Sequence, residues 1–399
     1  MGLLMMLGLI VIYAIGPQRA HVLNTLTGAD LGSNFFFIKQ VVSLTAALAA
    51  FAFFAYLPFK WVDKYAWHIL LAAFGTCLLL AVADFANLGI AQESLGATRW
   101  LNLGPISFQP SEALKFGVLV YLASFLGRRV KAGEINDASA SLVPVAVIAA
   151  ISVLFVIFLQ KDMGTGLALT AIILGMLYVG GIKLKTMGVI VGGLVLAMVM
   201  LILIAPHRMD RVATYLSGDS TSVDDPGGYH ITHAKIAIGS GGLLGVGIGN
   251  SVQATGYLPE AINDSVFAIM GETFGFVGLV VIIVLFTALL IRLLKVMGWL
   301  PDPRMRLMVA GVFAWLGSHI VLNIAAMIGL APLTGITLPL LSYGGTSMVF
   351  IAAALGLAFQ VSGYTDHRIG NKEAGNADSN SRRRVRRSRY AGSRGTARA

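Results

Sequence analysis

Charged residues are scarce in this 399-residue sequence, where Asp, Glu, Lys and Arg make up only 12% of the chain. An ordinary soluble protein has about a quarter of its residues charged. Hydrophobic residues account for 57%, and the mean hydropathy is +0.80. This balance excludes a soluble globular protein and predicts an integral membrane protein.

Cysteine is nearly absent as well. The single one, Cys77, lies in the apolar run CLLLAVA, which excludes a disulfide framework or a cysteine metal cluster within one chain. Histidine does not supply a zinc site either, because His230 and His233 are three positions apart with no further His or Cys nearby. The glycines of residues 239–249 lack the Gly-Lys-Ser/Thr of a phosphate-binding loop, so we expect them to allow close backbone approach or a re-entrant turn.

Acidic residues are fewer than basic ones, and the formal net charge is +10. Residues 364–399 alone contain ten Lys or Arg and three Asp or Glu, so most of this excess lies at the carboxyl end. The segment SRRRVRRSRYAGSRGTARA has no apolar periodicity. It predicts a disordered basic tail that binds anionic lipid at the membrane surface rather than nucleic acid.

Long apolar runs are abundant, and ten of them approach the length of about 20 residues that a helix needs to cross the hydrocarbon. The predicted fold class is an all-α polytopic membrane protein, with a membrane domain over residues 1–363 and the tail after it. The predicted spans are 2–16, 34–57, 67–88, 109–127, 142–160, 164–182, 186–205, 264–291, 307–329 and 342–363.

Lys and Arg in short loops indicate the cytoplasmic side of a membrane. They place both termini inside, and most acidic residues then lie outside, where we expect the chemistry. The outer loop of residues 206–263 is long for a connection, so we expect short helices and re-entrant backbone over the mouth of the bundle. The basic residues that set this orientation are Lys60, Lys64, Arg128, Arg129, Lys131, Lys183, Lys185, Arg292, Lys295, Arg304 and Arg306.

Three acidic residues lie at the outer ends of predicted spans: Glu112 in FQPSEALK, Asp162 in LQKDMGTG and Asp264 in LPEAINDSVFAI. An ionisable group at the membrane is costly unless paired or hydrated, so each is a functional candidate. Helix capping, or an ion pair with Lys115 or Lys161, is the structural alternative for the first two. Together with nearby cations, the acids would suit an anionic, membrane-delivered substrate such as a diphosphate. The cations are Arg99, Lys115, Lys161, Arg208 and Arg211.

Four segments of residues 1–363 resemble, in order, the motifs of the SEDS family of bacterial cell-wall polymerases. They are GATRWLNLGPISFQPSEALK, QKDMGTGLAL, GVGIGNSVQATGYLPEAINDSVFAIMGETFG and GLAPLTGITLPLLSYGGTSM. The third is more similar to the division branch, FtsW, than to the elongation branch, RodA. Around the family's essential acid the usual His-Thr-Asp-Phe is here Ile262, Asn263, Asp264 and Ser265, and the usual GEELG is GETFG.

The resemblance implies a peptidoglycan glycosyltransferase of the bacterial cytoplasmic membrane. It would polymerise lipid II at the outer face, at the division septum, together with a class B penicillin-binding protein and other division proteins. It further implies that Asp264 is the essential acid, here expected to be the general base of an inverting transfer. A divalent cation, Mg²⁺ or Mn²⁺, held by Glu112 or Asp162 is a further expectation. The expected substrate-binding residues are Glu112, Lys115, Asp162, Arg99, Arg208, Arg211 and Glu260.

Two other functions are open at this point. A flippase for the lipid-linked precursor would need an alternating cavity that reaches the midplane, usually with discontinuous helices and charges inside it. A noncatalytic scaffold for division proteins would tolerate replacement of the outer acids. The position of the acids at helix ends, rather than in mid-span, favours outer-face chemistry.

Overall fold

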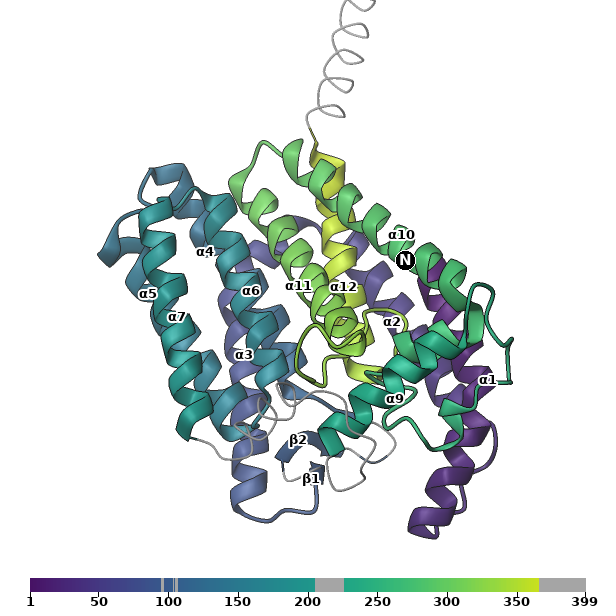
Figure 1. Cartoon of the computed structure of the whole chain (residues 1–399). Coiled ribbons are helices and arrows are strands. Elements are labelled where there is room, and N and C mark those ends of the chain that lie inside the picture. The colour runs from purple at the N-terminus through teal and green to yellow at the C-terminus, as the bar shows by residue number, and fades with distance from the viewer. Residues whose placement is uncertain (95–96, 103, 105–106, 205–225, 366–399) are drawn as a thin grey trace, which may run out of the picture.

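The computed structural model describes residues 1–94, 97–102, 104, 107–204 and 226–365. It is a bundle of long helices whose loops gather at two opposite ends (Figure 1). The helices are α1 (Gly2–Thr27), α2 (Phe35–Tyr56), α3 (Phe59–Phe85), α4 (Pro110–Ala132), α5 (Val143–Val153), α6 (Met163–Gly180), α7 (Leu184–Ile204), α9 (Pro226–Ser240), α10 (Val266–Gly298), α11 (Pro303–Met327) and α12 (Gly345–Val361).

Short elements complete the described chain. The π-helical turns η1 (Ala138–Leu142) and η2 (Leu154–Leu159) extend α5 at both ends. The 3₁₀ turn η3 (Gln253–Thr255) lies between α9 and α10, and the 3₁₀ turn η4 (Ser362–Tyr364) follows α12. A small antiparallel sheet joins α3 to α4, with the strand order β1-β2-β3. Its strands are β1 (Ala91–Ser94), β2 (Ala97–Asn102) and β3 (Ser107–Phe108).

Each predicted span overlaps a helix of the bundle. Among the described residues, eight helices are long and apolar enough to cross a membrane, so the prediction of a helical, polytopic membrane protein is confirmed. The count of ten stays a prediction.

The first predicted span was too short, because α1 continues through Pro17 to Thr27 instead of ending at residue 16. Proline lacks an N–H and usually ends a helix. Within a membrane bundle, neighbouring helices and side chains stabilise a helix that contains it. The extra turns bring Arg19 to the outer loop, with consequences described below.

The helix α4 lies at the centre of the bundle and packs against α3, α6, α11 and α12. It is buried almost without interruption from Pro110 to Gly127. A helix that faces protein on all sides does not need the hydropathy of a lipid-facing one, which explains how α4 accommodates Glu112 and Lys115. Its carboxyl end extends to Ala132, five residues beyond the predicted limit.

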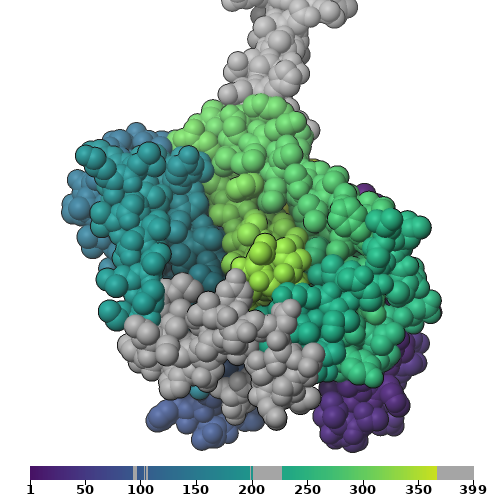
Figure 2. All heavy atoms as spheres, in the orientation of Figure 1, coloured from purple at the N-terminus to yellow at the C-terminus, as the bar shows by residue number. Residues whose placement is uncertain are grey.

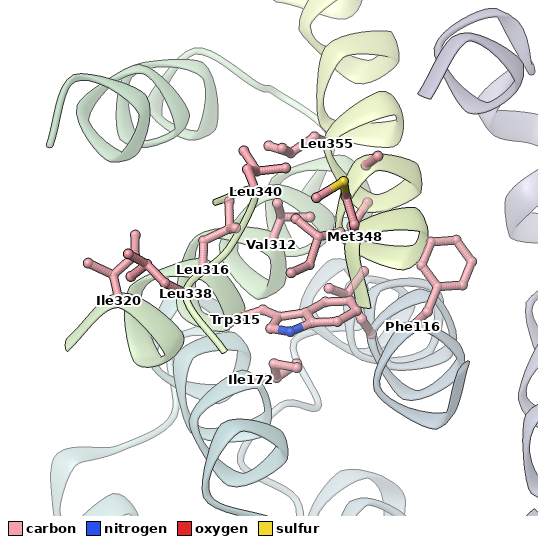
Figure 3. Packing of buried hydrophobic residues seen from close by; sticks show 14 of the residues in the cluster. Phe116, Ile172, Val312, Trp315, Leu316, Ile320, Leu338, Leu340, Met348 and Leu355 are labelled. Carbon is pink, nitrogen blue, oxygen red and sulfur yellow. The ribbon is translucent and has the colours of Figure 1, made fainter. Parts of the chain in front are cut away.

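The largest buried side chain of the core is Trp315, on α11. Figure 3 shows its ring among side chains from several elements: Phe116 from α4, Ile172 from α6 and Met348 from α12. Leu338, from the segment between α11 and α12, packs in the same cluster. This tight apolar packing fixes α11 against α4, on which the site depends.

An ion-pair network joins α3, α4 and α11 at the end of the bundle where α12 also ends (Figure 1). Asp302 is the N-cap of α11 and accepts hydrogen bonds from Arg304 and from Lys131 of α4. Arg304 also donates to Asp63 of α3 at 2.8 Å. Although burial by itself would raise it, these hydrogen bonds lower the pKa of Asp302 to about 2. The network therefore clamps three helices at this end.

The helix α10 is interrupted at Gly275, whose φ of 67° and ψ of −167° are not helical. The break is filled by the loop that follows α9, because a Cβ on Gly275 would lie 2.3 Å from the nitrogen of Gly245. A Cβ on Gly241 would lie 2.0 Å from the carbonyl oxygen of Gly271. The expectation that these glycines allow close backbone approach is therefore confirmed.

Candidate functional site

The site is organised by one polar face of α11. Trp315, His319 and Asn323 follow at intervals of four residues, so they lie on one side of the helix. All three are buried. The face connects an ion pair inside the bundle with the acid loop at the mouth, here defined as residues 258–265.

Glu112 and Lys115 form a buried ion pair one helical turn apart on α4. The Lys115 ammonium donates to Oε1 of Glu112 at 2.7 Å and lies 3.1 Å from Nε2 of His319. It also lies 5.0 Å from the centre of the Trp315 ring, within range of a cation–π contact. Oε2 of Glu112 is buried and has no partner among the described residues. The structure thus shows the ion pair that was the structural alternative for Glu112. A diphosphate would bind Lys115 only if it replaced the present contacts of the ammonium with Glu112 and His319.

The contacts of His319 define its tautomer. Nε2 accepts from the indole N–H of Trp315 at 3.2 Å and faces the Lys115 ammonium, so it carries no proton. Nδ1 then carries the proton and donates to the carbonyl of Thr337 at 3.3 Å. His319 thereby connects the ion pair to the segment between α11 and α12.

Asp264 lies on the acid loop immediately before α10 and is half-buried. Burial raises the pKa of its carboxyl to about 7, and repulsion by Glu260 adds to the shift, against the hydrogen bonds that the carboxyl accepts locally. Ser265 is one of these donors, at 3.5 Å. A carboxyl with a pKa near neutrality is suited to accept a proton from a reacting hydroxyl at physiological pH.

Residues from two distant helices, α1 and α9, contact the acid loop around Asp264. Glu260 pairs with Arg19 of α1 at 3.2 Å and accepts a hydrogen bond from Asn263. His230 of α9 lies 2.6 Å from the Ser265 hydroxyl. Burial lowers the pKa of His230 to about 4, against the pull of Glu260, so the ring is neutral at pH 7.

Asn323 holds the acid loop against the segment between α11 and α12. Its side-chain amide donates to the carbonyl of Asp264 and to that of Ile336, each at 2.7 Å. A backbone bond from Tyr343 to Ile262, at 2.8 Å, fixes the same two segments. Asn323, which lies four residues after His319 on α11, therefore fixes the backbone of Asp264 to this helix.

Asp162 caps α6 as its N-cap residue. Oδ1 accepts from the backbone N–H of Thr165 at 2.9 Å, and Oδ2 accepts from the hydroxyl of Thr165 and from Gln109. Arg99 of β2 donates to the carbonyls of Gln160 and Lys161, at 3.2 and 2.7 Å. Asp162 and Arg99 thus hold the turn before α6, as in the structural alternative for Asp162.

Glu272 is a further buried carboxylate near the site, on α10. It accepts from the Ser251 hydroxyl at 2.5 Å and from the backbone N–H groups of Val252 and Gln253. A carboxylate that accepts several N–H and O–H bonds rigidifies the backbone that donates them. Glu272 therefore fixes the loop that leads to the acid loop.

The predicted site residues fall into three groups. Glu260 and Asp264 lie together on the acid loop, Glu112 and Lys115 are connected to it through α11, and Asp162 and Arg99 form a separate turn next to α4. Arg208 and Arg211 lie outside the described residues.

Three residues of the site were missed, namely Arg19, His319 and Asn323. Arg19 was missed because the first span was predicted to end at residue 16, whereas α1 continues to Thr27. A polar residue every fourth position of an apolar span was the available signal for the other two.

A resident metal ion has little support in the described part of the chain. There, no group of three or more His, Cys, Asp or Glu side chains is placed to hold one. The carboxylate oxygens of Asp162 already accept hydrogen bonds from the chain, and Oε1 of Glu112 is bound to Lys115. We therefore derive no chemical step through a metal.

The bundle of long apolar helices, with a buried ion pair inside it and acidic residues at one mouth, defines a polytopic membrane protein. A family model described as cell cycle protein, for FtsW, RodA and SpoVE, matches residues 1–367. The chain belongs to this family.

Two curated relatives and two solved structures illustrate the similarity. A probable peptidoglycan glycosyltransferase FtsW from Nitrosomonas europaea is 33% identical over 363 residues, 90% of each chain. Stage V sporulation protein E from Bacillus subtilis is 32% identical over 366 residues, 91% of this chain and 95% of that one. A chain from a structure described as structural coordination of polymerization and crosslinking by a peptidoglycan synthase complex has a TM-score of 0.67 at 27% identity, and covers 89% and 96%. A mutant of the rod shape determining protein RodA from Thermus thermophilus has a TM-score of 0.60 at 25% identity, covering 90% and 94%.

Proposed function

We propose that this protein is a peptidoglycan glycosyltransferase that polymerises lipid II into glycan strands during septal cell-wall synthesis. The family and the names of its relatives support this function. The observation that carries it is the acid loop, where a half-buried carboxyl with a pKa of about 7 lies at the mouth of a membrane bundle.

The chemistry requires few groups. Lipid II has an α-linked sugar on a diphosphate, and the strand has β-1,4 linkages, so each transfer inverts the anomeric centre. A single displacement needs one base for the acceptor hydroxyl, because diphosphate leaves without protonation when cations stabilise it. An inverting hydrolase uses two carboxyls because its leaving group is an alkoxide. One acid at the mouth is therefore sufficient.

Asp264 is the base in this proposal. Its carboxylate accepts the proton of the acceptor hydroxyl as the new bond to the sugar forms and the bond to diphosphate breaks. Asn323 and Glu272 position it, the first through the backbone of Asp264 and the second through the preceding loop. The half-buried guanidinium of Arg99, together with Arg208 or Arg211, is proposed to bind diphosphate.

The orientation and the surroundings are part of the proposal. The ion-pair network of Lys131, Asp302 and Arg304 lies at the end opposite the acid loop, and positive charge is retained inside. This supports cytoplasmic termini and an outward-facing site in the bacterial cytoplasmic membrane. A class B penicillin-binding protein and other division proteins are the proposed partners, and anionic lipid is proposed to bind the basic tail. A divalent cation bound with the diphosphate is proposed as well.

The test is strand formation from purified lipid II by the protein in liposomes, with and without a class B partner. Polymer that a muramidase digests to disaccharide units is the expected product. Movement of labelled lipid II across the bilayer without polymer would favour transport. Neither reaction, from folded protein with an active partner, would favour a scaffold.

A further inference from the structure

The glycine-rich loop, defined as residues 241–252, runs along the side of α10 rather than away from the bundle. Figure 1 shows it beside the first turns of α10, and Figure 2 shows this flank as one continuous surface. Backbone bonds fix its position at the break of the helix. They run from Phe276 N to Gly242 O (2.8 Å), Val277 N to Leu243 O (3.1 Å), Val246 N to Glu272 O (2.9 Å) and Gly247 N to Thr273 O (3.1 Å).

The position of these bonds along α10 gives the depth of the loop. Arg292 is exposed near the other end of the helix and lies 5.9 Å from the exposed ring of Trp299, a pairing typical of a membrane interface. Phe276 is 16 residues from Arg292, which is about 24 Å along a helix. The hydrocarbon of a bilayer is about 30 Å thick, and tilt of the helix only reduces the height. Measured from the interface at Arg292, the residues that are hydrogen-bonded to Phe276 and Val277 therefore lie within the hydrocarbon and do not reach the opposite membrane surface.

The side chains at this depth are apolar and exposed. Leu243 is 71% exposed and Leu244 is 79% exposed, the highest values among the apolar residues of the loop. They continue the exposed face of α10, where Phe276, Val277 and Val281 are also exposed. A water-facing loop would expose polar side chains instead. The face of α10 contacts lipid in a membrane protein, and the loop extends that face.

The backbone of the loop also fits a hydrocarbon environment. Irregular backbone at membrane depth is tolerated only where its polar groups find partners. Here Gly245 N donates to Gly241 O at 2.8 Å, in addition to the bonds to α10. The close approach that permits these bonds requires glycine at residues 245 and 275, as described above.

We propose that the glycine-rich loop is embedded in the hydrocarbon of the leaflet on the side of the acid loop, where lipid acyl chains contact Leu243 and Leu244. The embedded turn sets the depth of the acid loop, because Glu272 accepts hydrogen bonds from the last two residues of the glycine-rich loop and from Gln253, and Leu258 N donates to Gln253 O at 2.9 Å. Depth matters for a substrate whose diphosphate lies at the membrane surface. This second part rests on the proposed function.

Spin labels measure the depth of the loop directly. In a Cys77→Ala background, a nitroxide is attached to Leu244→Cys, to Val281→Cys as the lipid-facing reference and to Thr255→Cys as the water-facing control on η3. The protein is reconstituted in phosphatidylglycerol–phosphatidylethanolamine vesicles. We expect the label at 244 to resemble that at 281, with high access for oxygen and low access for a water-soluble nickel chelate. Nickel access equal to that at 255 would overturn the proposal, and low access for both reagents, which indicates a covering protein, would do the same.

An activity comparison tests the second part. Leu243→Glu should reduce strand formation at least tenfold, since a carboxylate in the hydrocarbon is costly and would displace the loop, whereas Thr255→Glu should change it less than twofold. Equal activities of these two variants would contradict the role in setting depth. Absence of polymer from the wild type would instead reject the proposed function, while the label accessibilities would still decide whether the loop is embedded.

Discussion

Asp264 acquires its character from its surroundings rather than from its own chemistry. Burial and the repulsion of Glu260 raise its pKa to about 7, so the folded protein retains a proton that the unfolded chain releases near pH 4. Because the folded state binds more protons in this window, stability falls as the pH rises through it. The carboxylate thus costs folding stability at neutral pH, as is common for a residue retained for function.

The rate of strand formation should rise with pH through about 7, because only the ionised form of Asp264 accepts a proton. Initial rates across the neutral range, at constant ionic strength, measure the midpoint. Glu260→Gln should shift this midpoint to lower pH by removing the repulsion, although burial, the larger cause, stays. A rate that is flat across neutrality would contradict the assignment.

The pair of Glu112 and Lys115 should be needed for folding as a pair. Lys115→Met leaves a buried carboxylate without its partner, which costs about 3 to 5 kcal/mol, so the melting temperature should fall by several degrees. The double variant Glu112→Gln/Lys115→Met should recover most of this loss, as measured by thermal unfolding in one detergent. A single variant as stable as the wild type would contradict the ion pair, and a stable double variant that forms no strands would assign the pair to substrate contact.

The spacing of residues along the sequence predicted some of the contacts between individual residues of the site. Glu112 and Lys115 are three apart in a helix, so their pairing could be expected. The partners of Lys115 could not, because His319 is 204 residues away in the chain and only packing brings α11 to α4. The pKa of Asp264 depends on burial by distant segments in the same way.

Among the elements, the break in α10 should be the most sensitive to a small change. Gly275→Ala adds a Cβ 2.3 Å from Gly245 N in a conformation that L-residues rarely adopt. The strain should cost about 1 to 3 kcal/mol or displace the glycine-rich loop. Gly298→Ala, at the end of the same helix with no atom within 4 Å of the new Cβ, is the matched control. Limited proteolysis between residues 241 and 252 measures the displacement, and equal cleavage of both variants would argue against it.

The stability that the ion-pair network around Asp302 contributes should depend on pH in the direction opposite to that described for Asp264. The pKa of Asp302 is lowered to about 2, so its charge stabilises the fold at pH above about 4, and this contribution is lost as the pH falls through 2. Asp302→Asn keeps a good N-cap while removing the charge. Its melting temperature should lie below that of the wild type at neutral pH, and the difference should shrink on acidification from about pH 4 to about pH 2. A difference that does not vary with pH would point to the cap alone.

Helix limits were predictable where composition changes sharply, as at α2, whose observed limits differ from the predicted ones by a single residue at each end. The predicted limits were wrong where contacts with neighbouring helices override a local sequence signal. Pro17 does not end α1, and the basic residues at the end of α4 remain helical because ion pairs hold them. These contacts belong to the tertiary structure and cannot be predicted from the local sequence pattern.

For the molecule as a whole, composition alone determined the class, since little charge and long apolar runs fit only a membrane bundle. The packing of the outer loop did not follow from composition. Its glycines suggested close approach, but the contact with α10 joins segments whose pairing only the fold reveals. The motifs that resembled the SEDS family supplied the reaction, and the structure connects two of them, at Lys115 and Asp264, through α11.

The most direct test of the account is strand formation from purified lipid II by wild type and Asp264→Asn, reconstituted with the same class B partner. The account predicts polymer from the wild type and a rate about 100 to 10,000-fold lower for the variant, the usual contribution of a general base. The melting temperature of the variant should be equal or higher at pH 8, because the costly carboxylate is gone. A variant that polymerises at the wild-type rate would contradict the central claim that Asp264 accepts the proton.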